Sequence, residues 1–372
     1  MKLSKSTLTK LIIGCFIFII VSCKSSNDSH QIHPNSNLVF HDVEEYEELA
    51  INNLTQWEKE FKFNINDTVT IDISEQKYKI ESVADALIVE NEVLVLDDGT
   101  TTIQSISFNG SPNKTVARKG RGPGEIASPV NMVKMGDGFV VMDRVNGIIY
   151  YDKNKEPTKA ERIKFMPDYF CMNENYFVKS SYFSRDNNVD NHLIFEINSE
   201  SKIIQRYSRK YDHEDNMLVY LMSSGPIKCI NQYNMLVNAY TVALPLIEFY
   251  NTEKQKNRNY KLTDINPYPY EFKGNLKRAN INLGTTYHRS GNLSVLRDRF
   301  VILQFYEIYH PNNPDAEFKP QIFSYIFDLK SDDIHYSYSL PYIRATSKDK
   351  LFVKNHTAEF TYFLHTYELV KN

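Results

Sequence analysis

A glycine-rich stretch holds the most chemically suggestive side chains of the sequence. Its Gly-Arg-Gly-Pro-Gly core contains Arg121, and it is preceded by the cations Arg118 and Lys119 and followed by the acid Glu125. A Walker phosphate loop would end in Gly-Lys-Ser or Gly-Lys-Thr, and a dinucleotide fingerprint would open a helix. This stretch does neither, because Pro129 soon interrupts any helix. We interpret it as a tight connection between two structural units, in which glycine supplies positive φ and proline rigidity.

The charged side chains of this connection are still the leading candidates for ligand contact. If the units on either side enclose a central channel, Arg118, Arg121 and Glu125 would line its entrance. A second set of candidates is aromatic, because Tyr268 and Tyr270 alternate with prolines in a stiff loop. Tyr287 and Arg289 are placed in another long connection, and exposed aromatic loops would suit stacking on a sugar or a peptide. The alternative is that these tyrosines fill strands, which they favour by propensity.

Motifs of catalysis and metal binding are missing from the sequence. It has no HExxH, CxxC, GxSxG or EF-hand pattern, and His213 lies in a charged loop typical of a solvated segment. We therefore predict no metal and no cofactor. Asp97, Asp98 and Asp143 follow apolar runs and could act as acids or bases, although capping of turns is the commoner use of such residues.

Two cysteines could be joined. Cys171 and Cys229 stand at similar places before two apolar runs, so they could approach one another across adjacent units. An exported location would permit a disulfide, and two buried free thiols are the alternative.

The N-terminus predicts that export. Lys2, Lys5 and Lys10 precede the apolar run Leu11–Val21, which is too short to span a bilayer and is typical of a signal peptide. The run ends in Ile-Val-Ser-Cys, which resembles the lipobox of bacterial lipoproteins. That resemblance implies removal of residues 1–22, lipid on Cys23, and a cell-envelope location on the outer membrane, with its face left open. An ordinary secretory signal is the alternative.

Two segments separate Cys23 from the main body. Residues 24–37 are polar and lack apolar periodicity, so we predict a flexible, lipidated tether over residues 23–41. Within residues 42–66, Tyr46, Leu49, Trp57 and Phe61 recur close to helical spacing among many glutamates. This spacing predicts a short amphipathic helix that packs against the main domain.

Residues 67–372 have the texture of an all-β domain. Short apolar runs are divided by turn residues, and six run pairs begin at Val93, Phe139, Tyr176, Met235, Phe300 and Leu351, on average about 52 residues apart. This spacing is close to that of four-stranded propeller blades, so we predict a six-bladed β-propeller. The alternating strand Thr68–Ile73 is predicted to complete the last blade. A β-sandwich with a second domain is the alternative.

The overall charge excludes one class of partner. Lys and Arg number 43 against 46 Asp and Glu, for a formal charge of −3, so we expect no nucleic-acid partner.

The run from the Phe-Asn-Gly turn at residues 108–110 through Gly-Arg-Gly-Pro-Gly-Glu resembles a signature of six-bladed, NHL-like propeller lipoproteins of Bacteroidota. The resemblance is specific between about Ile80 and Asn154, and it implies the fold and export but no reaction. We expect a membrane-anchored, non-catalytic binding or protein-interaction module for a glycan, a peptide or an envelope protein. The alternative is a hydrolase or lyase that acts on glycans or lactones within the channel.

Overall fold

The computed structural model describes residues 30–31, 46–163, 166–180, 192–200, 202–210, 216–240, 245–254, 256–266, 270–273, 276–279, 285–310, 321–355 and 358–372. The chain divides into two compact units. The smaller unit comprises residues 1–36 and 269–281 and contains a three-stranded antiparallel sheet. The strands of this sheet are β1 (His30–Gln31), β21 (Tyr270–Lys273) and β22 (Leu276–Ala279).

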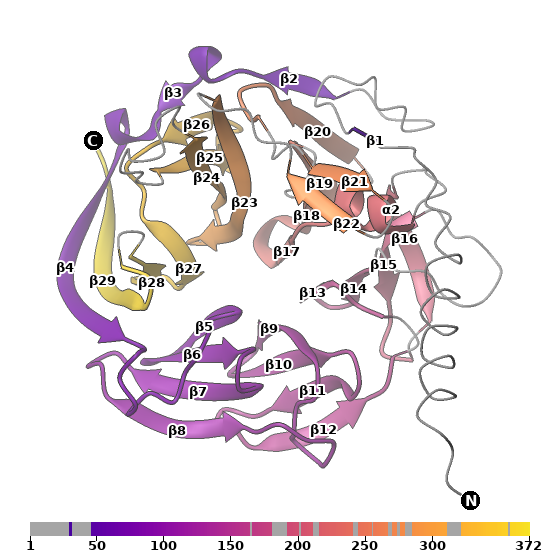
Figure 1. Ribbon diagram of the computed structural model, residues 1–372, viewed down its shortest axis with the longest axis vertical. Coiled ribbons are helices and arrows are strands. Elements are labelled where there is room, and N and C mark those ends of the chain that lie inside the picture. Colours follow the sequence, from indigo (N-terminus) through magenta and orange to yellow (C-terminus); the bar gives the residue numbers. More distant parts are fainter. Residues whose placement is uncertain are drawn as a thin grey trace, which may run out of the picture. The chain divides into compact units, whose positions relative to one another are not determined.

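The larger unit is a six-bladed β-propeller, as the sequence predicted. Figure 1 shows its six sheets around a common centre. The innermost strand of each sheet contacts the innermost strands of both neighbouring sheets, so the ring is closed. Listed from the innermost strand outward, blade 1 contains β5 (Asp85–Val89), β6 (Glu92–Asp97), β7 (Thr102–Ser107) and β8 (Pro112–Ala117). Blade 2 contains β9 (Pro129–Met135), β10 (Gly138–Asp143), β11 (Gly147–Tyr151) and β12 (Pro157–Glu161).

The remaining blades follow the same order, and two of them gain a fifth strand. Blade 3 contains β13 (Tyr169–Met172), β14 (Tyr176–Lys179), β15 (His192–Ile197) and β16 (Ile203–Arg209). Blade 4 contains β17 (Ile227–Ile230), β18 (Met235–Tyr240), β19 (Leu246–Asn251), β20 (Lys256–Leu262) and β2 (Glu47–Leu49). Blade 5 contains β23 (Thr285–Leu296), β24 (Phe300–His310), β25 (Gln321–Asp328), β26 (Ile334–Ser337) and β3 (Thr55–Gln56). Blade 6 contains β27 (Tyr342–Thr346), β28 (Lys350–Lys354), β29 (Thr361–Lys371) and β4 (Phe61–Asp72).

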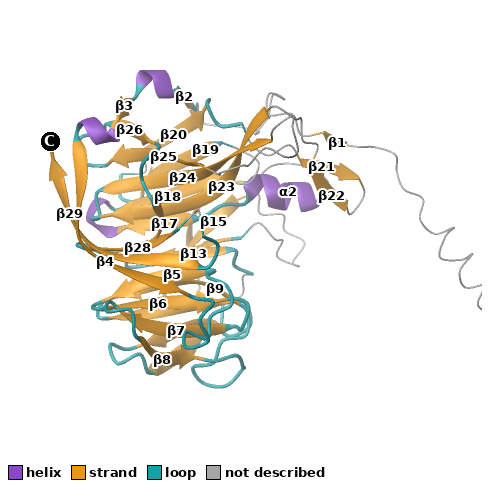
Figure 2. Cartoon of the chain, turned by 60° about the vertical axis from the view of Figure 1, so that its left-hand side comes forward, coloured by secondary structure: helices purple, strands orange, loops and turns teal. Residues whose placement is uncertain are grey.

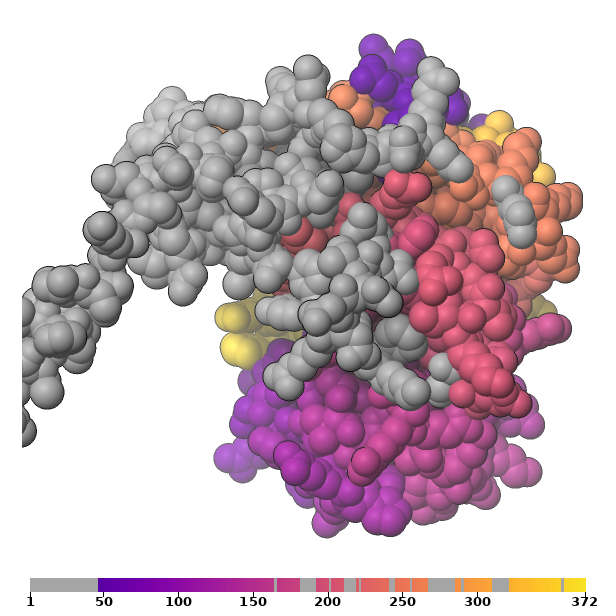
Figure 3. Space-filling view, turned by 90° about the vertical axis from the view of Figure 1, so that its right-hand side faces the viewer, coloured from indigo at the N-terminus to yellow at the C-terminus, as the bar shows by residue number. Residues whose placement is uncertain are grey.

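The six run pairs of the sequence are the second and third strands of the blades. Val93 lies in β6 and Phe139 in β10, and both are fully buried. These strands are covered on both faces by the neighbouring blades, which explains why they form continuous apolar runs rather than alternating ones. Figure 3 shows consecutive blades side by side on the outer surface, magenta blade 2 next to red blade 3 and then orange blade 4.

Ring closure follows the prediction. β4 pairs antiparallel with β29, so that Val69 faces Leu364, and it becomes the outermost strand of blade 6. The last blade therefore combines the C-terminal end of the chain with a strand that precedes blade 1 (Figure 1).

The predicted amphipathic helix within residues 42–66 is wrong for the described part of that segment. Residues 46–60, which we call the belt, form β2, β3 and the short 3-10 turns η1 (Ile51–Asn53) and η2 (Trp57–Lys59). β2 adds parallel to β20, and β3 adds parallel to β26. Figure 2 shows these elements along the outside of blades 4 and 5. The predicted domain boundary at residue 67 consequently lies inside β4.

The belt is extended because its apolar residues pack against different blades. Leu49 joins a core cluster of blades 4 and 5, whereas Trp57 joins a cluster of blades 5 and 6 that also contains Phe61, the first residue of β4. The open edges of β20 and β26 offer hydrogen bonds that an isolated helix would not use. Glu48 also lies 3.4 Å from the Lys261 ammonium of β20.

Helical structure is scarce in the described residues. It consists of α2 (Asn216–Ser223) and the 3-10 turns η1, η2 and η3 (Asn231–Tyr233). None of the helices in this described part has the length and apolar character that a membrane span requires.

Candidate functional site

The innermost strands all begin at one end of the ring. In blades 1, 3 and 6 the first residue of the innermost strand pairs with a residue at or next to the end of the second strand. The pairs are Asp85 with Leu96, Tyr169 with Lys179, and Tyr342 with Lys354. Because the strands of a blade alternate in direction, these first residues surround the same end of the ring axis. We call Asp85, Tyr169, Tyr342 and the nearby Arg344 the ring mouth.

Tyr169 connects residues from several blades. Its side chain is half-buried. Burial is the largest cause that raises the pKa of its phenol to about 12, and Tyr220 of α2, Asp168, Tyr342 and Asp85 contribute to the same rise. Blades 3 and 6 stand opposite one another in a ring of six, so Tyr169 and Tyr342 lie on opposite sides of the axis.

Tyr342 carries an aromatic cluster on the side of blade 6. Its ring lies 4.7 Å from the ring of Tyr306 in β24, tilted by 36°. The guanidinium of Arg344 lies 5.9 Å from the Tyr342 ring centre, a cation–π distance. Burial raises the pKa of Tyr306 well above its usual value, and Tyr342 adds to that effect. Tyr342 is 5% exposed, so this cluster belongs to the packing where blades 5 and 6 meet.

An irregularity of strand β27 sets the direction of the Arg344 side chain. The pairing of β27 with β28 shifts between Ile343 and Ala345, so Arg344 occupies a β-bulge, a feature that commonly redirects a side chain near functional sites. Its Nη2 donates to the carbonyl oxygens of Val83 and Ala84, at 2.5 and 2.7 Å, and so links blade 6 to the start of blade 1. These bonds use one of the three guanidinium nitrogens. Burial opposes the charge of Arg344, but nearby tyrosines and Asp85 outweigh it and raise the pKa of the guanidinium.

Asp85 is positioned by the next blade. Its Oδ2 accepts a 2.7 Å hydrogen bond from the backbone N–H of Met132 in β9. Hydrogen bonds to the backbone therefore hold the side chains of Asp85 and Arg344 in place before any ligand binds, which lowers the entropy lost on binding.

The tip of the glycine-rich connection packs against the outer edge of blade 2. A Cβ on Gly124 would lie 2.3 Å from Pro157, the first residue of the outermost strand of blade 2, and Gly124 has a φ of +73°. A position of Arg118, Arg121 and Glu125 at a channel entrance stays a prediction. The connection runs back from the outer edge of blade 1, and its tip stays beside the outer edge of blade 2.

The same connection has the structural role that the sequence favoured. The Glu125 carboxylate accepts a 2.7 Å hydrogen bond from the Gly122 N–H, and the Asn146 amide donates to the Glu125 carbonyl oxygen at 2.8 Å. Arg118, Lys119 and Arg121 are exposed. Glu125 holds the loop in shape, while the three cations point to solvent.

The aromatic candidates are placed differently from the prediction. Tyr287 is buried within β23, at 4% exposure, because that strand is longer than expected and includes this residue. It is therefore not an exposed loop residue. Tyr268 lies outside the described residues. Tyr270 lies in β21 and Arg289 in β23, and for both residues the structure describes the backbone alone.

Two aspartates cap turns, as the sequence favoured. The carboxylate of Asp143, fully buried at the end of β10, accepts hydrogen bonds from four backbone N–H groups, those of Ala127, Ser128, Val145 and Asn146. Asp97 repeats this arrangement at the end of β6, where its partners are the N–H groups of Glu81, Ser82 and Gly99 and the hydroxyl of Thr100. Both carboxylates hold the incoming connection of their blade, whereas Asp98 is exposed.

Cys171 and Cys229 form a disulfide, with their Cα atoms 5.6 Å apart. It joins β13 to β17, the innermost strands of blades 3 and 4. A buried polar network also links the second strands of these two blades. In it, the Lys179 ammonium of β14 donates a 2.6 Å hydrogen bond to the Asn238 side chain of β18. The Asn238 amide in turn donates to Glu248 at 2.7 Å. Blades 3 and 4 are therefore joined by a covalent bond and by this network.

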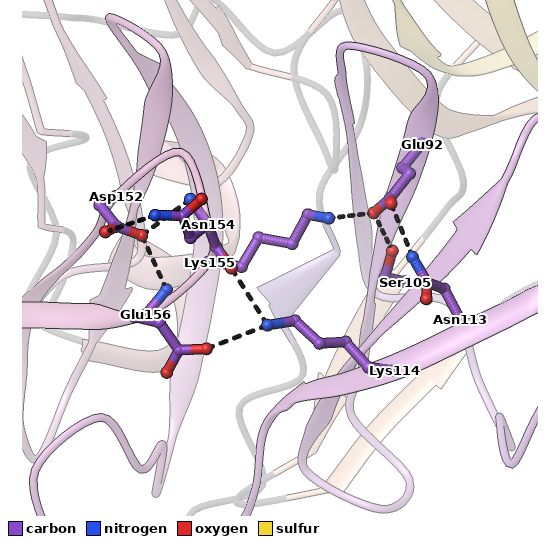
Figure 4. A network of polar contacts seen from close by, with 8 residues as sticks. All are labelled: Glu92, Ser105, Asn113, Lys114, Asp152, Asn154, Lys155 and Glu156. Atoms are coloured by element: carbon purple, nitrogen blue, oxygen red, sulfur yellow. Dashed lines mark hydrogen bonds and ion pairs between the residues drawn. The ribbon is translucent and has the colours of Figure 1, made fainter.

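Another polar network joins blades 1 and 2 (Figure 4). Lys155 of blade 2 forms an ion pair with Glu92 of blade 1, and Lys114 lies 3.1 Å from Glu156. Burial opposes the charge of Glu92, but Lys155, Ser105 and Asn113 outweigh it and lower the pKa of the carboxyl. Each charge in this network is met by a partner from the chain itself, so we assign it to the packing of the blades.

No cluster of three or more His, Cys, Asp or Glu side chains within the described ranges could hold a metal ion. His213 lies outside those ranges, as do the predicted signal peptide and Cys23.

Sequence reasoning missed the ring mouth. Asp85, Tyr169 and Tyr342 each begin the strand before one of the apolar centres, and each of these strands is only four or five residues long. These three residues share one feature in the sequence: each begins the short strand that comes directly before a repeated apolar run. That signal becomes visible only once the repeat is aligned blade by blade.

Solved structures share this fold. One is a Bacteroides fragilis protein described as exported, with 12% identity and a TM-score of 0.56 over 83% of this chain and 95% of that chain. Another is a member of the DUF4221 family from Bacteroides vulgatus, with 9% identity and a TM-score of 0.51 over 84% of this chain and 99% of that chain. At such identities the likeness shows the fold alone. No protein-family profile and no curated protein matches the sequence.

Proposed function

We propose that this chain is an exported, lipid-anchored propeller that acts as a non-catalytic binding module in the cell envelope and takes its ligand at the ring mouth. One observation carries the binding site. The strand order and register set Asp85 of blade 1, Tyr169 of blade 3 and Tyr342 and Arg344 of blade 6 at one end of the ring axis. Polar groups that converge from several blades at the end of a propeller are a usual form of binding site.

The state of these side chains favours binding over reaction. The Asp85 carboxylate accepts a backbone N–H, and Arg344 donates to two backbone carbonyls. The Tyr169 phenol is protonated at neutral pH, as a tyrosine with an ordinary pKa also is, so it can donate a hydrogen bond to a ligand. Fixed donors and acceptors of this kind recognise a polar ligand without needing to move.

Export and anchoring rest on the N-terminus. The basic residues, the short apolar run and the Ser-Cys end resemble a lipoprotein signal, and a protein of the same fold from Bacteroides fragilis is described as exported. The test is a Cys23→Ala variant expressed in a bacterial host of the same envelope type. We expect wild-type protein in the outer-membrane fraction with radiolabelled lipid, and variant protein without label. Equal labelling of both would contradict lipidation at Cys23.

The binding proposal is tested with a thermal-shift screen of the full chain in detergent. The panel contains oligosaccharides, peptides and divalent metals, and turnover is assayed for every compound that shifts the melting temperature. We expect a shift without turnover that is lost in Tyr342→Phe. A shift with turnover would contradict the non-catalytic assignment and would favour the hydrolase or lyase alternative.

A further inference from the structure

We infer that the hairpin formed by β21 and β22 lies against the membrane surface and contacts anionic lipid headgroups. This inference rests on the proposed lipid anchor at Cys23 and adds a second contact between the chain and the bilayer. Three features support it: the pairing of the hairpin with the N-terminal segment, its charge, and the register of its aromatic residues.

Strand pairing holds the hairpin close to the predicted anchor. β21 and β22 lie in the sequence between β20 of blade 4 and β23 of blade 5, yet β21 pairs antiparallel with β1. His30 of β1 faces Phe272, and it follows Cys23 by seven residues. Seven extended residues span at most about 25 Å, so a lipid on Cys23 would keep the hairpin within that distance of its attachment point.

The charge of the hairpin is complementary to an anionic surface. Its two strands contain three cations, Lys273, Lys277 and Arg278, against one carboxylate, Glu271. The whole chain has a formal charge of −3, so the hairpin is a basic element in an acidic protein. Each basic residue near an anionic bilayer strengthens binding roughly five-fold. An anionic bilayer therefore attracts this segment while it repels the chain as a whole.

The register of the hairpin gathers its two aromatic residues on one face. Tyr270 pairs with Ala279. Phe272 pairs with Lys277, and residues paired across two strands share a face. Tyrosine combines an apolar ring with a polar hydroxyl, and lysine an apolar stem with a charged end, so both suit the boundary between headgroups and acyl chains. The aromatic face is therefore the one that contacts the bilayer.

The other face still contributes to the attraction. It carries the remaining residues of the two strands, Glu271, Lys273, Leu276 and Arg278. A single sheet is about 10 Å thick, which is close to one Debye length at physiological ionic strength. Lys273 and Arg278 consequently remain within electrostatic reach of the headgroups.

The experiment places a fluorescent reporter on the hairpin. The full chain, as processed by a bacterial host of the same envelope type, is purified in detergent and reconstituted into phosphatidylcholine vesicles with brominated acyl chains. Tyr270→Trp introduces the reporter, and wild type is the control because its single tryptophan, Trp57, is 1% exposed. With phosphatidylglycerol added to the vesicles, we expect bromine to quench the fluorescence of the variant and to leave that of wild type unchanged.

Charge removal tests the role of the headgroups. In the Tyr270→Trp background, the triple change Lys273→Gln, Lys277→Gln and Arg278→Gln should reduce the quenching to the level seen without phosphatidylglycerol. The matched control removes three exposed cations of the glycine-rich connection by Arg118→Gln, Lys119→Gln and Arg121→Gln, and it should leave the quenching unchanged. Quenching that survives the hairpin triple change would overturn the contact with anionic headgroups.

Vesicle flotation separates this inference from the anchor, because a lipidated chain floats with vesicles of either composition. Flotation without added quenching of Tyr270→Trp refutes the hairpin contact and leaves the anchor standing. Flotation only with phosphatidylglycerol, lost in the hairpin triple variant, supports the contact and refutes the anchor. If the chain floats with neither composition, both are refuted.

Discussion

Cys171 and Cys229, 58 residues apart in sequence, are joined by a disulfide between the innermost strands of blades 3 and 4. The bond fastens two blades next to the ring axis. A crosslink over a loop of this length stabilises mainly by restricting the unfolded chain, typically by about 2–4 kcal/mol. We predict that Cys171→Ala with Cys229→Ala lowers the free energy of unfolding by about this amount. Denaturant titration with and without a reductant measures it.

The double alanine variant is also the control for the reductant. Wild type should lose stability on reduction, whereas the variant should not respond. Equal stability of oxidised wild type, reduced wild type and variant would show that the bond contributes nothing.

The buried aspartates at the ends of β6 and β10 should be among the most sensitive positions of the chain. Asp143→Ala leaves four backbone N–H groups without their acceptor, so we expect a loss of about 2–4 kcal/mol. Asp97→Ala should behave alike. Asp98→Ala is the matched control, because this neighbour is exposed and should change stability by less than about 0.5 kcal/mol. Similar losses for Asp97 and Asp98 in thermal unfolding would argue against the capping role.

Lys179 should make the free energy of unfolding depend on pH between about 7 and 10. Burial lowers the pKa of its ammonium to about 7, although Glu248 and Asp168 partly oppose this. The unfolded chain binds the proton more tightly than the folded chain, so the stability of the wild type should rise with pH between about 7 and 10. Lys179→Met removes this group, and the difference in unfolding free energy between wild type and variant should move in favour of wild type over that range. A difference independent of pH would contradict the shift.

Trp57 tests whether the belt belongs to the folded ring. It is 1% exposed and lies 4.3 Å from the Phe61 ring and 4.8 Å from the Phe300 ring. We expect Trp57→Ala to cost about 3–5 kcal/mol, whereas Ile65→Ala, at an exposed site on β4, should cost little. Trp57 is also the single tryptophan of the sequence, so its fluorescence reports on the belt. Its unfolding transition should coincide with that of circular dichroism, and an earlier transition would show that the belt detaches first.

The fold could be predicted because burial on both faces leaves a strong pattern. Val93 and Phe139 begin apolar runs that no solvent-facing strand would contain, and their recurrence identifies the blades. The belt could not be predicted in the same way, since Leu49, Trp57 and Phe61 have helical spacing by coincidence and contact separate blades.

The candidate site was harder to predict than the fold. The ring mouth is assembled by short strands from blades 1, 3 and 6, and nothing local marks Tyr169 or Tyr342 as neighbours. Conversely, Arg121 and Glu125 attracted attention because glycines surround them. Gly124 packs closely against Pro157, and Gly120 and Gly122 lie against the Glu125 side chain.

The central claim is that the ligand binds at the ring mouth, and hydrogen–deuterium exchange of the full chain tests it most directly. Exchange is compared with and without the strongest compound from the screen. We predict added protection in the peptides that contain Asp85, Tyr169 and Tyr342–Arg344, together and at the same ligand concentration. Protection confined to residues 118–125 or to the outer strands β8, β12 and β16, with the ring mouth unchanged, would contradict it.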